Sequence, residues 1–159
     1  MRILMLRMAN GDALSLRIQR LGPGDRDAAR ALFEVMAIAF EEDREPLNDA
    51  YVDGLVARRD LWVVVAWQGA AVVGGLTAHV LPMTRSASTE LFIYDLAVHP
   101  AYQRRGVGRG LISFLRERAR AEGHGVIFVP ADDEDTHALE FYRAVGGVGA
   151  PVTIFTFDE

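Results

Sequence analysis

A turn rich in glycine and arginine, AYQRRGVGRG at residues 101–110, has the residue types needed to bind an anion. Gly106 and Gly108 have no Cβ, so an oxyanion can approach their backbone closely. A helix-like apolar run follows, and the first amides of a helix lack intrahelical acceptors and carry partial positive charge. The turn also supplies charged donors from Arg104, Arg105 and Arg109. It therefore predicts a cradle for a phosphate or diphosphate, with a solvated basic turn as the alternative.

Asp95 and Glu90 are candidates for contact with an amine. Asp95 lies inside the apolar stretch ELFIYDLAV, where an ionised carboxylate is costly unless it is paired or faces a cleft. We expect a base or an anchor for a substrate ammonium, and the alternative is a structural carboxylate bonded to nearby backbone. Glu90 begins the same stretch an odd number of residues earlier. Both side chains can therefore line one site only if a β-bulge intervenes.

Two acidic loops form a second group of candidates for binding an acceptor. Their residues are Asp132, Asp133, Glu134 and Asp135 in one loop and Glu41 and Glu42 in the other. If both loops face one cleft, they would attract a polycationic amine, such as a polyamine or an aminosugar, and disfavour an acidic substrate. The alternative is a solvated charge run, since acids before a helix also complement its N-terminal dipole.

The hydrophobic pattern predicts one α/β domain that positions these residues. Alternation indicates half-buried strands, near-continuous β-formers indicate buried strands, and apolar residues every three or four positions indicate helices. The expected strands are residues 14–21, 61–67, 71–81, 90–98, 126–130 and 151–157. The expected helices are residues 25–40, 48–59, 108–121 and 136–145. The resulting order is β-α-α-β-β-β-α-β-α-β, a mixed α/β arrangement.

Composition excludes several classes of protein. The chain has 159 residues and a net charge of −5, which argues against a nucleic-acid binder that works through a basic surface. No apolar run reaches the length of a membrane span, and the first ten residues lack the pattern of a signal peptide. There are no cysteines, and the four histidines have no ligand-like spacing, so we expect no metal site. We expect a cytoplasmic protein.

The stretch YDLAVHPAYQRRGVGRGLI resembles the acetyl-CoA-binding motif of the GNAT N-acetyltransferases, whose signature is Q/R-x-x-G-x-G/A. Residues 103–108 match the signature, and LAVHP matches its lead-in. The resemblance implies a GNAT-like mixed, mostly antiparallel central sheet flanked by about four helices. It also implies a single GNAT domain over residues 1–159, with residues 1–12 as a loose N-terminal extension.

By this resemblance, acetyl-CoA is the cosubstrate and an amine is the acceptor. The implied cofactor-binding residues are Leu96, Ala97 and Val98 for the pantetheine arm, and Arg104, Arg105, Gly106, Val107, Gly108 and Arg109 for the pyrophosphate. The backbone of the first group would pair with the arm as an added strand does, and the amides of the second would hold the phosphates.

Tyr142 lies on the helix where this family often has a tyrosine. A phenol with a pKa of ~10 is protonated at neutral pH, so it could give a proton to a departing thiolate whose own pKa is ~8.5. The resemblance thus implies a proton donor. The alternative is a core aromatic residue with a hydrogen-bonded hydroxyl.

Three stretches together are similar to the aminoglycoside 3-N-acetyltransferases of the gentamicin-resistance type: TELFIYDLAV, AVVGGLTAHVLP and ADDEDTHALEFY. The matching site positions are Glu90, Tyr94, Asp95, Asp132, Asp135 and Tyr142. The similarity implies direct attack by the 3-amino group of an aminoglycoside in a ternary complex, with Asp95 and the loop acids on the drug's ammonium groups. The chain departs from the pattern in its amino-terminal third and at His137, where proline is expected.

Two other functions fit the same residues. The chain could acetylate a different cationic amine, such as a polyamine or a peptide or protein amine. It could also bind acetyl-CoA as a non-catalytic sensor, although a sensor needs neither Tyr142 nor Asp95. Exposed strand edges could support a homodimer, and we expect neither a nucleic acid nor a membrane as partner.

Overall fold

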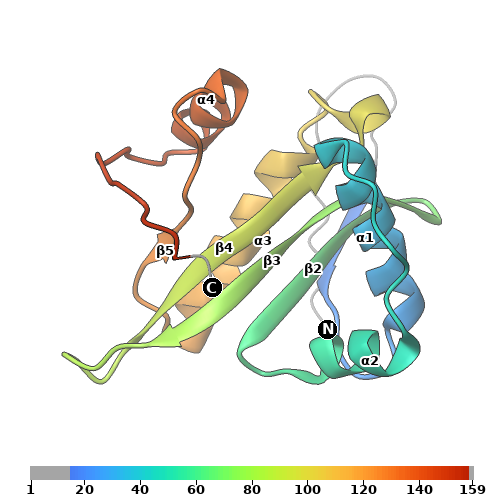
Figure 1. Ribbon diagram of the computed structural model, residues 1–159, viewed down its shortest axis with the longest axis horizontal. Coiled ribbons are helices and arrows are strands. Elements are labelled where there is room, and N and C mark those ends of the chain that lie inside the picture. Colours follow the sequence, from blue (N-terminus) through green and yellow to red (C-terminus); the bar gives the residue numbers. More distant parts are fainter. Residues whose placement is uncertain (1–14, 158–159) are drawn as a thin grey trace. The chain divides into compact units, whose positions relative to one another are not determined.

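The computed structural model describes residues 15–157, which fall into two compact units (Figure 1). The first unit ends at Val129 and the second begins at Pro130. The extension expected at residues 1–12 lies outside the described residues. Along residues 15–157, no helix is both long enough and apolar enough to cross a membrane.

A five-stranded sheet forms the centre of the first unit. Its strands are β1 (Leu16–Arg20), β2 (Leu61–Gln68), β3 (Ala71–Pro82), β4 (Thr89–Val98) and β5 (Ile127–Phe128). They follow one another in space in sequence order, and all neighbours are antiparallel except β4 and β5, which are parallel. Residues 61–67 of β2 are buried without interruption, as near-continuous β-formers predict for a strand covered on both faces.

Helices cover both faces of this sheet. α1 (Arg26–Phe40) and α2 (Asp49–Ala57) lie on one face, and α3 (Val107–Glu122) lies on the other (Figure 1). The apolar stripe predicted for residues 25–40 is confirmed, because Leu32 and Met36 of α1 join one buried cluster with Val52 of α2 and alternate residues of β2. Asp25 stands at the N-cap of α1, but its carboxylate accepts from the Gly22 amide at 2.8 Å rather than from a helix amide.

Two adjacent glycines of β3 let a helix approach the sheet from each side. A Cβ on Gly75 would lie 2.5 Å from a methyl carbon of Leu32 in α1 and 2.4 Å from the carbonyl oxygen of Val64. A Cβ on Gly74 would point to the other face, 3.3 Å from Val107 at the start of α3. The pair therefore sets how closely both helices pack beside the end of β4.

The second unit contains α4 (Thr136–Ala144). Asp135 caps it, since its carboxylate accepts a hydrogen bond from the Ala138 amide at 2.9 Å. After the helix, Gly146 has a φ of 92°, and the Gly147 amide donates to the Tyr142 carbonyl at 2.8 Å. A left-handed glycine thus ends the helix.

The strand predicted for residues 151–157 is wrong, because these residues form no strand. Their apolar side chains are exposed, with Phe157 at 92% and Ile154 at 69%. A run of β-forming residues becomes a strand only when another strand accepts its hydrogen bonds, and local preference does not supply that partner.

The predicted fold class is confirmed: a mixed, mostly antiparallel sheet with four α-helices among residues 15–157, plus the short 3-10 helix η1 (Pro100–Tyr102).

Candidate active site

The turn that follows β4 is fastened to the sheet by its own polar groups. The His99 amide donates to the Val73 carbonyl at 2.9 Å, and the side chain of Gln103 donates to the Val98 carbonyl at 3.1 Å. His99 also accepts, through Nδ1, from the Ala101 amide at 3.2 Å. These hydrogen bonds hold the turn against the ends of β3 and β4.

Two residues of the turn adopt a left-handed backbone conformation before α3 begins. Arg104 has a φ of 61°, and Gly106, the N-cap residue of α3, has a φ of 84°. The Gly110 amide makes a helical bond to the Gly106 carbonyl at 2.9 Å. Left-handed residues beside the open first turn of a helix produce a concavity of amide donors, which is the physical basis of anion binding at such turns.

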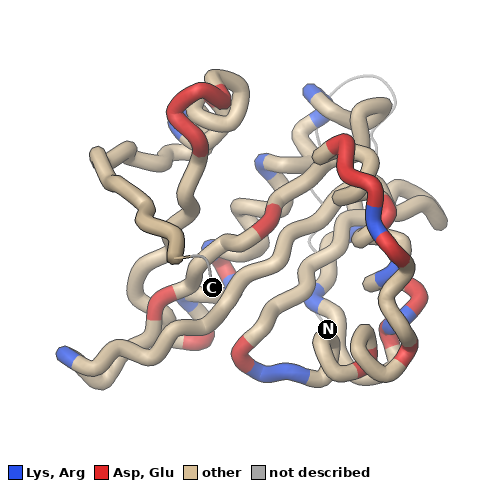
Figure 2. The backbone as a smooth tube through the Cα atoms, viewed as in Figure 1, with Lys and Arg blue, Asp and Glu red and all other residues tan. Residues whose placement is uncertain are grey.

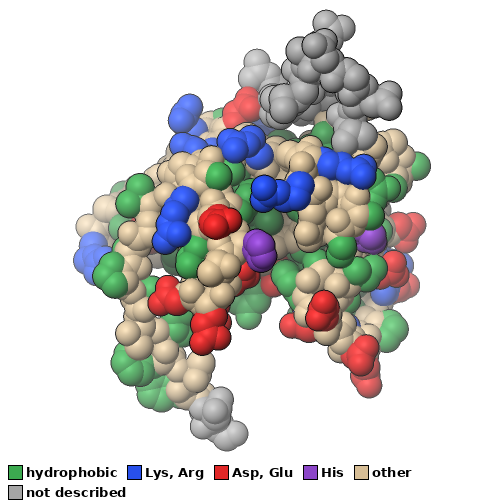
Figure 3. Space-filling view, turned by 90° about the horizontal axis from the view of Figure 1, so that it is seen from above, with side chains coloured by type: hydrophobic (Ala, Val, Ile, Leu, Met, Phe, Trp, Pro, Cys, Tyr) green, Lys and Arg blue, Asp and Glu red, His purple; other side chains and the backbone are tan. Residues whose placement is uncertain are grey.

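Arginines lie within this turn and at the start of α3. Arg104 and Arg105 are exposed, and the Arg105 guanidinium lies 5.6 Å from the ring centroid of Tyr102. Seen from above, several basic side chains lie close together on the surface (Figure 3). Val107 is 4% exposed and anchors the first turn of α3 in the core. The turn therefore exposes its guanidinium groups to solvent while Val107 holds the start of α3 in the core. Exposed charged donors of this kind suit the binding of a diphosphate.

A β-bulge in β4 brings Asp95 and Glu90 to one face of the sheet. Thr77 of β3 pairs with Asp95, but the next residue, Ala78, pairs with Ile93, so Tyr94 is the extra residue. Glu90 pairs with Leu81, four positions from Thr77, and residues an even number apart share a face of a strand. The condition that the sequence set for a shared site is met.

Asp95 has one hydrogen-bond donor from the neighbouring strand. The Thr77 hydroxyl donates to its Oδ2 at 3.0 Å, and the carboxylate is half-buried. The bond orients the side chain without neutralising it. The carboxylate is thus placed on the face of the sheet that Glu90 shares, where it could accept a proton or bind an ammonium.

The last residues of β4 have a strand partner on one side. Leu96, Ala97 and Val98 pair with Leu76, Gly75 and Gly74 of β3. On its other side β4 pairs with β5 only at Leu91 and Phe92. The β5 side of the end of β4 is thus beyond the reach of this short strand, which is where an extended ligand could add to the sheet.

The loop between α1 and α2 is exposed throughout, and its acidic residues are the red stretch that follows α1 in Figure 2. Glu41 adopts a left-handed conformation, φ 55°, and ends α1. Glu42 already has a partner, because the Arg44 guanidinium donates to its carboxylate at 2.6 Å. Of the two glutamates predicted to contact an acceptor, Glu42 is thus partly neutralised within its own loop.

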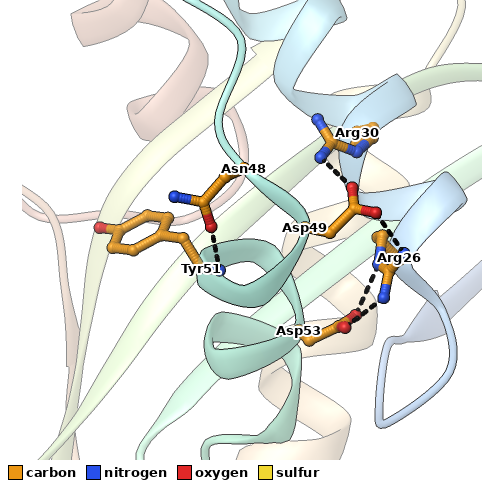
Figure 4. Close-up of polar contacts among 6 residues, drawn as sticks. All are labelled: Arg26, Arg30, Asn48, Asp49, Tyr51 and Asp53. Carbon is orange, nitrogen blue, oxygen red and sulfur yellow. Dashed lines mark hydrogen bonds and ion pairs between the residues drawn. The ribbon is translucent and has the colours of Figure 1, made fainter.

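An ion-pair network that the sequence analysis missed joins the two helices flanking this loop (Figure 4). Arg26 of α1 donates to Asp49 at 2.8 Å and to Asp53, both in α2, and Arg30 donates to Asp49 at 2.6 Å. The hydrogen bond from Arg26 lowers the pKa of the Asp53 carboxyl below its ordinary value. The available signal was the spacing of Asp49 and Asp53, which places two acids on one helix face.

The other acidic residues and Tyr142 belong to the second unit (Figure 2). Asp132 accepts from the Glu134 amide at 3.0 Å and Asp135 caps α4, so these two carboxylates also shape the loop. Burial, and to a lesser extent the Asp135 carboxylate, raises the pKa of Tyr142 to about 12. Its phenol therefore keeps its proton at neutral pH, a prerequisite for a proton donor.

Comparison with known proteins identifies a family. The model of the Acetyltransferase (GNAT) family matches residues 28–146. N-alpha-acetyltransferase RimI of Mycobacterium tuberculosis is 35% identical over 126 residues, which cover 79% of this chain and 76% of that protein.

Two solved structures are similar along almost the whole chain. Both are aminoglycoside acetyltransferases from uncultured soil metagenomic samples. The crystal structure of meta-AAC0020 with trehalose has a TM-score of 0.88 and 31% identity, covering 93% of this chain and 98% of that one; the same protein was also crystallised with sisomicin. HMB0005 has a TM-score of 0.84 and 32% identity, covering 91% of this chain and 99% of that one.

Proposed function

Because the chain belongs to the GNAT acetyltransferase family, we propose that it transfers the acetyl group of acetyl-CoA to an amine of an aminoglycoside. The bulge at Tyr94 carries this proposal, since it gives Glu90 and Asp95 one face of the sheet and so favours an acceptor with more than one ammonium. The likeness to meta-AAC0020, which has been crystallised with sisomicin, supports the same class of acceptor.

In this proposal, acetyl-CoA binds along the end of β4 and over the turn that follows it. Backbone groups of Leu96, Ala97 and Val98 pair with the pantetheine arm. The amides and guanidinium groups of residues 104–109 hold the pyrophosphate, in keeping with the left-handed turn and its arginines. The thioester is thereby held beside β4, the strand that carries Asp95.

The chemistry is a direct transfer between two bound substrates. An ammonium of the acceptor loses a proton to Asp95, directly or through a water, because only the neutral amine is a nucleophile. Its nitrogen attacks the thioester carbonyl carbon, a C–N bond forms, and the C–S bond breaks. Tyr142 gives its proton to the departing sulfur and regains one, through solvent, as the nitrogen loses its second proton to become an amide; Asp95 passes the first proton to solvent. The products are an amide, a free thiol and one proton released to solvent.

We assign the 3-amino group as the acetylated position, from the similarity of Glu90, Tyr94 and Asp95 to the strand motif of the 3-N-acetyltransferases. The remaining ammonium groups of the drug would bind the carboxylates of the two acidic loops. Mass spectrometry and NMR of the product, prepared with gentamicin as acceptor, identify the modified nitrogen directly.

A peptide α-amine is the second candidate acceptor, because RimI is 35% identical over most of the chain. A peptide terminus presents a single ammonium beside amide groups. Two carboxylates on one face of the sheet would then have one cation to share, which makes this acceptor the weaker match.

The deciding experiment measures free-thiol release from acetyl-CoA with a panel of acceptors: gentamicin, sisomicin, spermidine and a short peptide with a free amino terminus. We expect turnover with the aminoglycosides at a kcat/KM well above that for spermidine or the peptide. Turnover with the peptide alone would assign the chain to the second candidate. Calorimetric binding of coenzyme A with no thiol release for any amine would indicate a sensor.

A further inference from the structure

A row of aromatic rings crosses three strands on the face of the sheet that carries Asp95 and Glu90. His79 of β3, Phe92 of β4 and Phe128 of β5 are direct neighbours in the strand register. The ring centroids of His79 and Phe92 are 6.5 Å apart with planes at 31°, and those of Phe92 and Phe128 are 5.2 Å apart with planes at 34°. The three rings thus form a gently tilted floor.

Tyr94 stands as a wall beside this floor. Its ring plane makes an angle of 86° with Phe92 and 75° with His79, at centroid distances of 5.8 and 5.7 Å. Tyr94 is the extra residue of the bulge. Its ring therefore lies on the same side of the sheet as that of Phe92, but the planes of the two rings are nearly perpendicular. Floor and wall together make an aromatic corner, defined by His79, Phe92, Tyr94 and Phe128.

The aromatic corner is not part of the hydrophobic core. Tyr94 is 65% exposed and Phe128 is 41% exposed. At the other end of the same face, Leu32 of α1 packs on Gly75, and Ala97 is 3% exposed. α1 thus covers only part of this face. The four rings adjoin in pairs, and two of them are exposed, so they form a contiguous apolar surface of the kind that marks a binding site.

Carboxylates stand at both ends of the aromatic corner along β4. Glu90 precedes Phe92 by two positions and Asp95 follows Tyr94 directly, and all of them share one face. Their β3 partners, Leu81 and Thr77, are four residues apart, so the two carboxylates are separated along the strand by roughly 13 Å. The surface between them is aromatic. Its charge and shape fit a cationic molecule with rings in the middle and ammonium groups toward both ends.

We infer that the aromatic corner is the acceptor platform: a saturated aminosugar or aminocyclitol ring lies on His79, Phe92 and Phe128 against Tyr94, while its ammonium groups pair with Glu90 and Asp95. The inference rests on the proposed function and assigns to it three residues, His79, Phe92 and Phe128, that are not among the site positions matched by the sequence similarity. The C–H-rich face of a saturated ring packs on an aromatic plane, and adjacent ammonium groups gain cation–π attraction.

The platform separates ring-bearing acceptors from linear ones. Spermidine can reach two carboxylates but has no ring face to place on the floor. A peptide amino terminus has one ammonium and a flexible backbone. It can therefore pair with only one of the two carboxylates, and it has no ring to place on the aromatic corner. Loss of the rings should therefore weaken binding of an aminoglycoside selectively.

The test compares Tyr94→Leu, Tyr94→Phe and Phe128→Leu, with Phe114→Leu as the matched control. Phe114 is buried in α3, on the opposite face of the sheet, so its replacement costs stability without touching the platform. KM is measured for gentamicin, spermidine, a short peptide with a free amino terminus and acetyl-CoA, and the midpoint of thermal unfolding is measured for every variant. We expect Tyr94→Leu and Phe128→Leu to raise KM for gentamicin roughly 3- to 10-fold. KM for spermidine and for acetyl-CoA should stay within about twofold, and Tyr94→Phe, which keeps the ring, should raise KM for gentamicin less than Tyr94→Leu does.

The possible outcomes separate this inference from the proposed function. An unchanged gentamicin KM in both leucine variants overturns the platform and leaves aminoglycoside acetylation standing. An equal rise in KM for gentamicin and acetyl-CoA, shared by Phe114→Leu, assigns the rings to structure and also overturns it. If wild-type protein neither binds gentamicin by calorimetry nor acetylates it, the proposed function is overturned, and the platform with it. A peptide KM that rises in parallel would make the corner a peptide site.

Discussion

In the proposed reaction, the turn after β4 and the aromatic, acidic face of β3 and β4 bind opposite kinds of ligand by opposite means. The turn consists of consecutive residues, 99 to 110, and its donors are mostly backbone amides beside a left-handed glycine. The acceptor face takes Thr77 and His79 from β3 and Asp95 and Phe92 from β4, and exists only because the two strands pair in one register.

From this difference we expect the two halves of the reaction to tolerate sequence change differently. An anion site made of amides needs a few residues that permit the backbone conformation, and other side chains there can vary. A face made of side chains changes whenever a strand register or a residue type changes. We therefore expect the cosubstrate to be common across the family and the acceptor to differ among its members.

The largest effect should come from Tyr142→Phe, which tests whether a residue of the second unit takes part in the acetyl transfer itself. General acid catalysis contributes at least about 100-fold, so kcat should fall about that much, while KM for acetyl-CoA stays within about twofold. Because the pKa of Tyr142 is raised to about 12, its proton is retained through neutral pH. Activity should therefore show no alkaline loss from this group until the pH exceeds about 10, where folding also weakens because the unfolded phenol ionises first. Equal losses in kcat and in acetyl-CoA binding would remove the donor role.

Asp95→Asn should weaken acceptor use without affecting the cosubstrate. Hydrogen bonds to charged groups contribute about 1.5–3 kcal/mol, so kcat/KM for gentamicin should fall roughly 10- to 100-fold. Calorimetry should give the wild-type Kd for coenzyme A. Glu117→Gln is the matched control, since Glu117 is exposed on α3, on the opposite face of the sheet. A weaker Kd for coenzyme A in the Asp95 variant would break the separation between the two regions.

Gly106→Val should have the reverse effect. No atom lies within 4 Å of an added Cβ, so the cost comes from the φ of 84°, about 1–2 kcal/mol for a residue with a side chain. The Kd for coenzyme A should rise about 10-fold and KM for gentamicin should hardly change. Gly22→Val is the control, because Gly22 has the same open surroundings without a positive φ. If both valine variants bind coenzyme A normally, the turn is not the diphosphate site.

The smallest effect should come from Gly54→Ala in α2, beside the ion-pair network of Arg26. An added Cβ meets nothing within 4 Å, and alanine is favoured over glycine in a helix interior by about 0.5–1 kcal/mol. The free energy of unfolding in urea should rise by about that amount, with kcat and both KM values unchanged. A change in gentamicin KM alone would show that α2 shapes the acceptor face.

Most elements were predictable from the sequence because they depend on local patterns. The apolar stripe of α1, the buried run of β2 and the Asp135 cap each follow from residues within one or two turns or one strand. From the sequence, a β-bulge could be named only as the condition for Glu90 and Asp95 to share a site. Its presence at Tyr94 depends on the register in which β4 pairs with β3. The strand expected at residues 151–157 failed for the same reason, because a strand needs a partner that local preference cannot name.

By itself, the sequence determined the GNAT motif, the donors of the turn and the identity of the carboxylates. These are properties of consecutive residues, since glycine and arginine at a helix start have the same chemistry wherever the helix lies. Only the tertiary structure decided that Glu90 and Asp95 share a face, that four rings form a corner between them, and that Arg26 joins two helices. The physical reason is that side chains from different strands and helices become neighbours through hydrogen-bond register and packing.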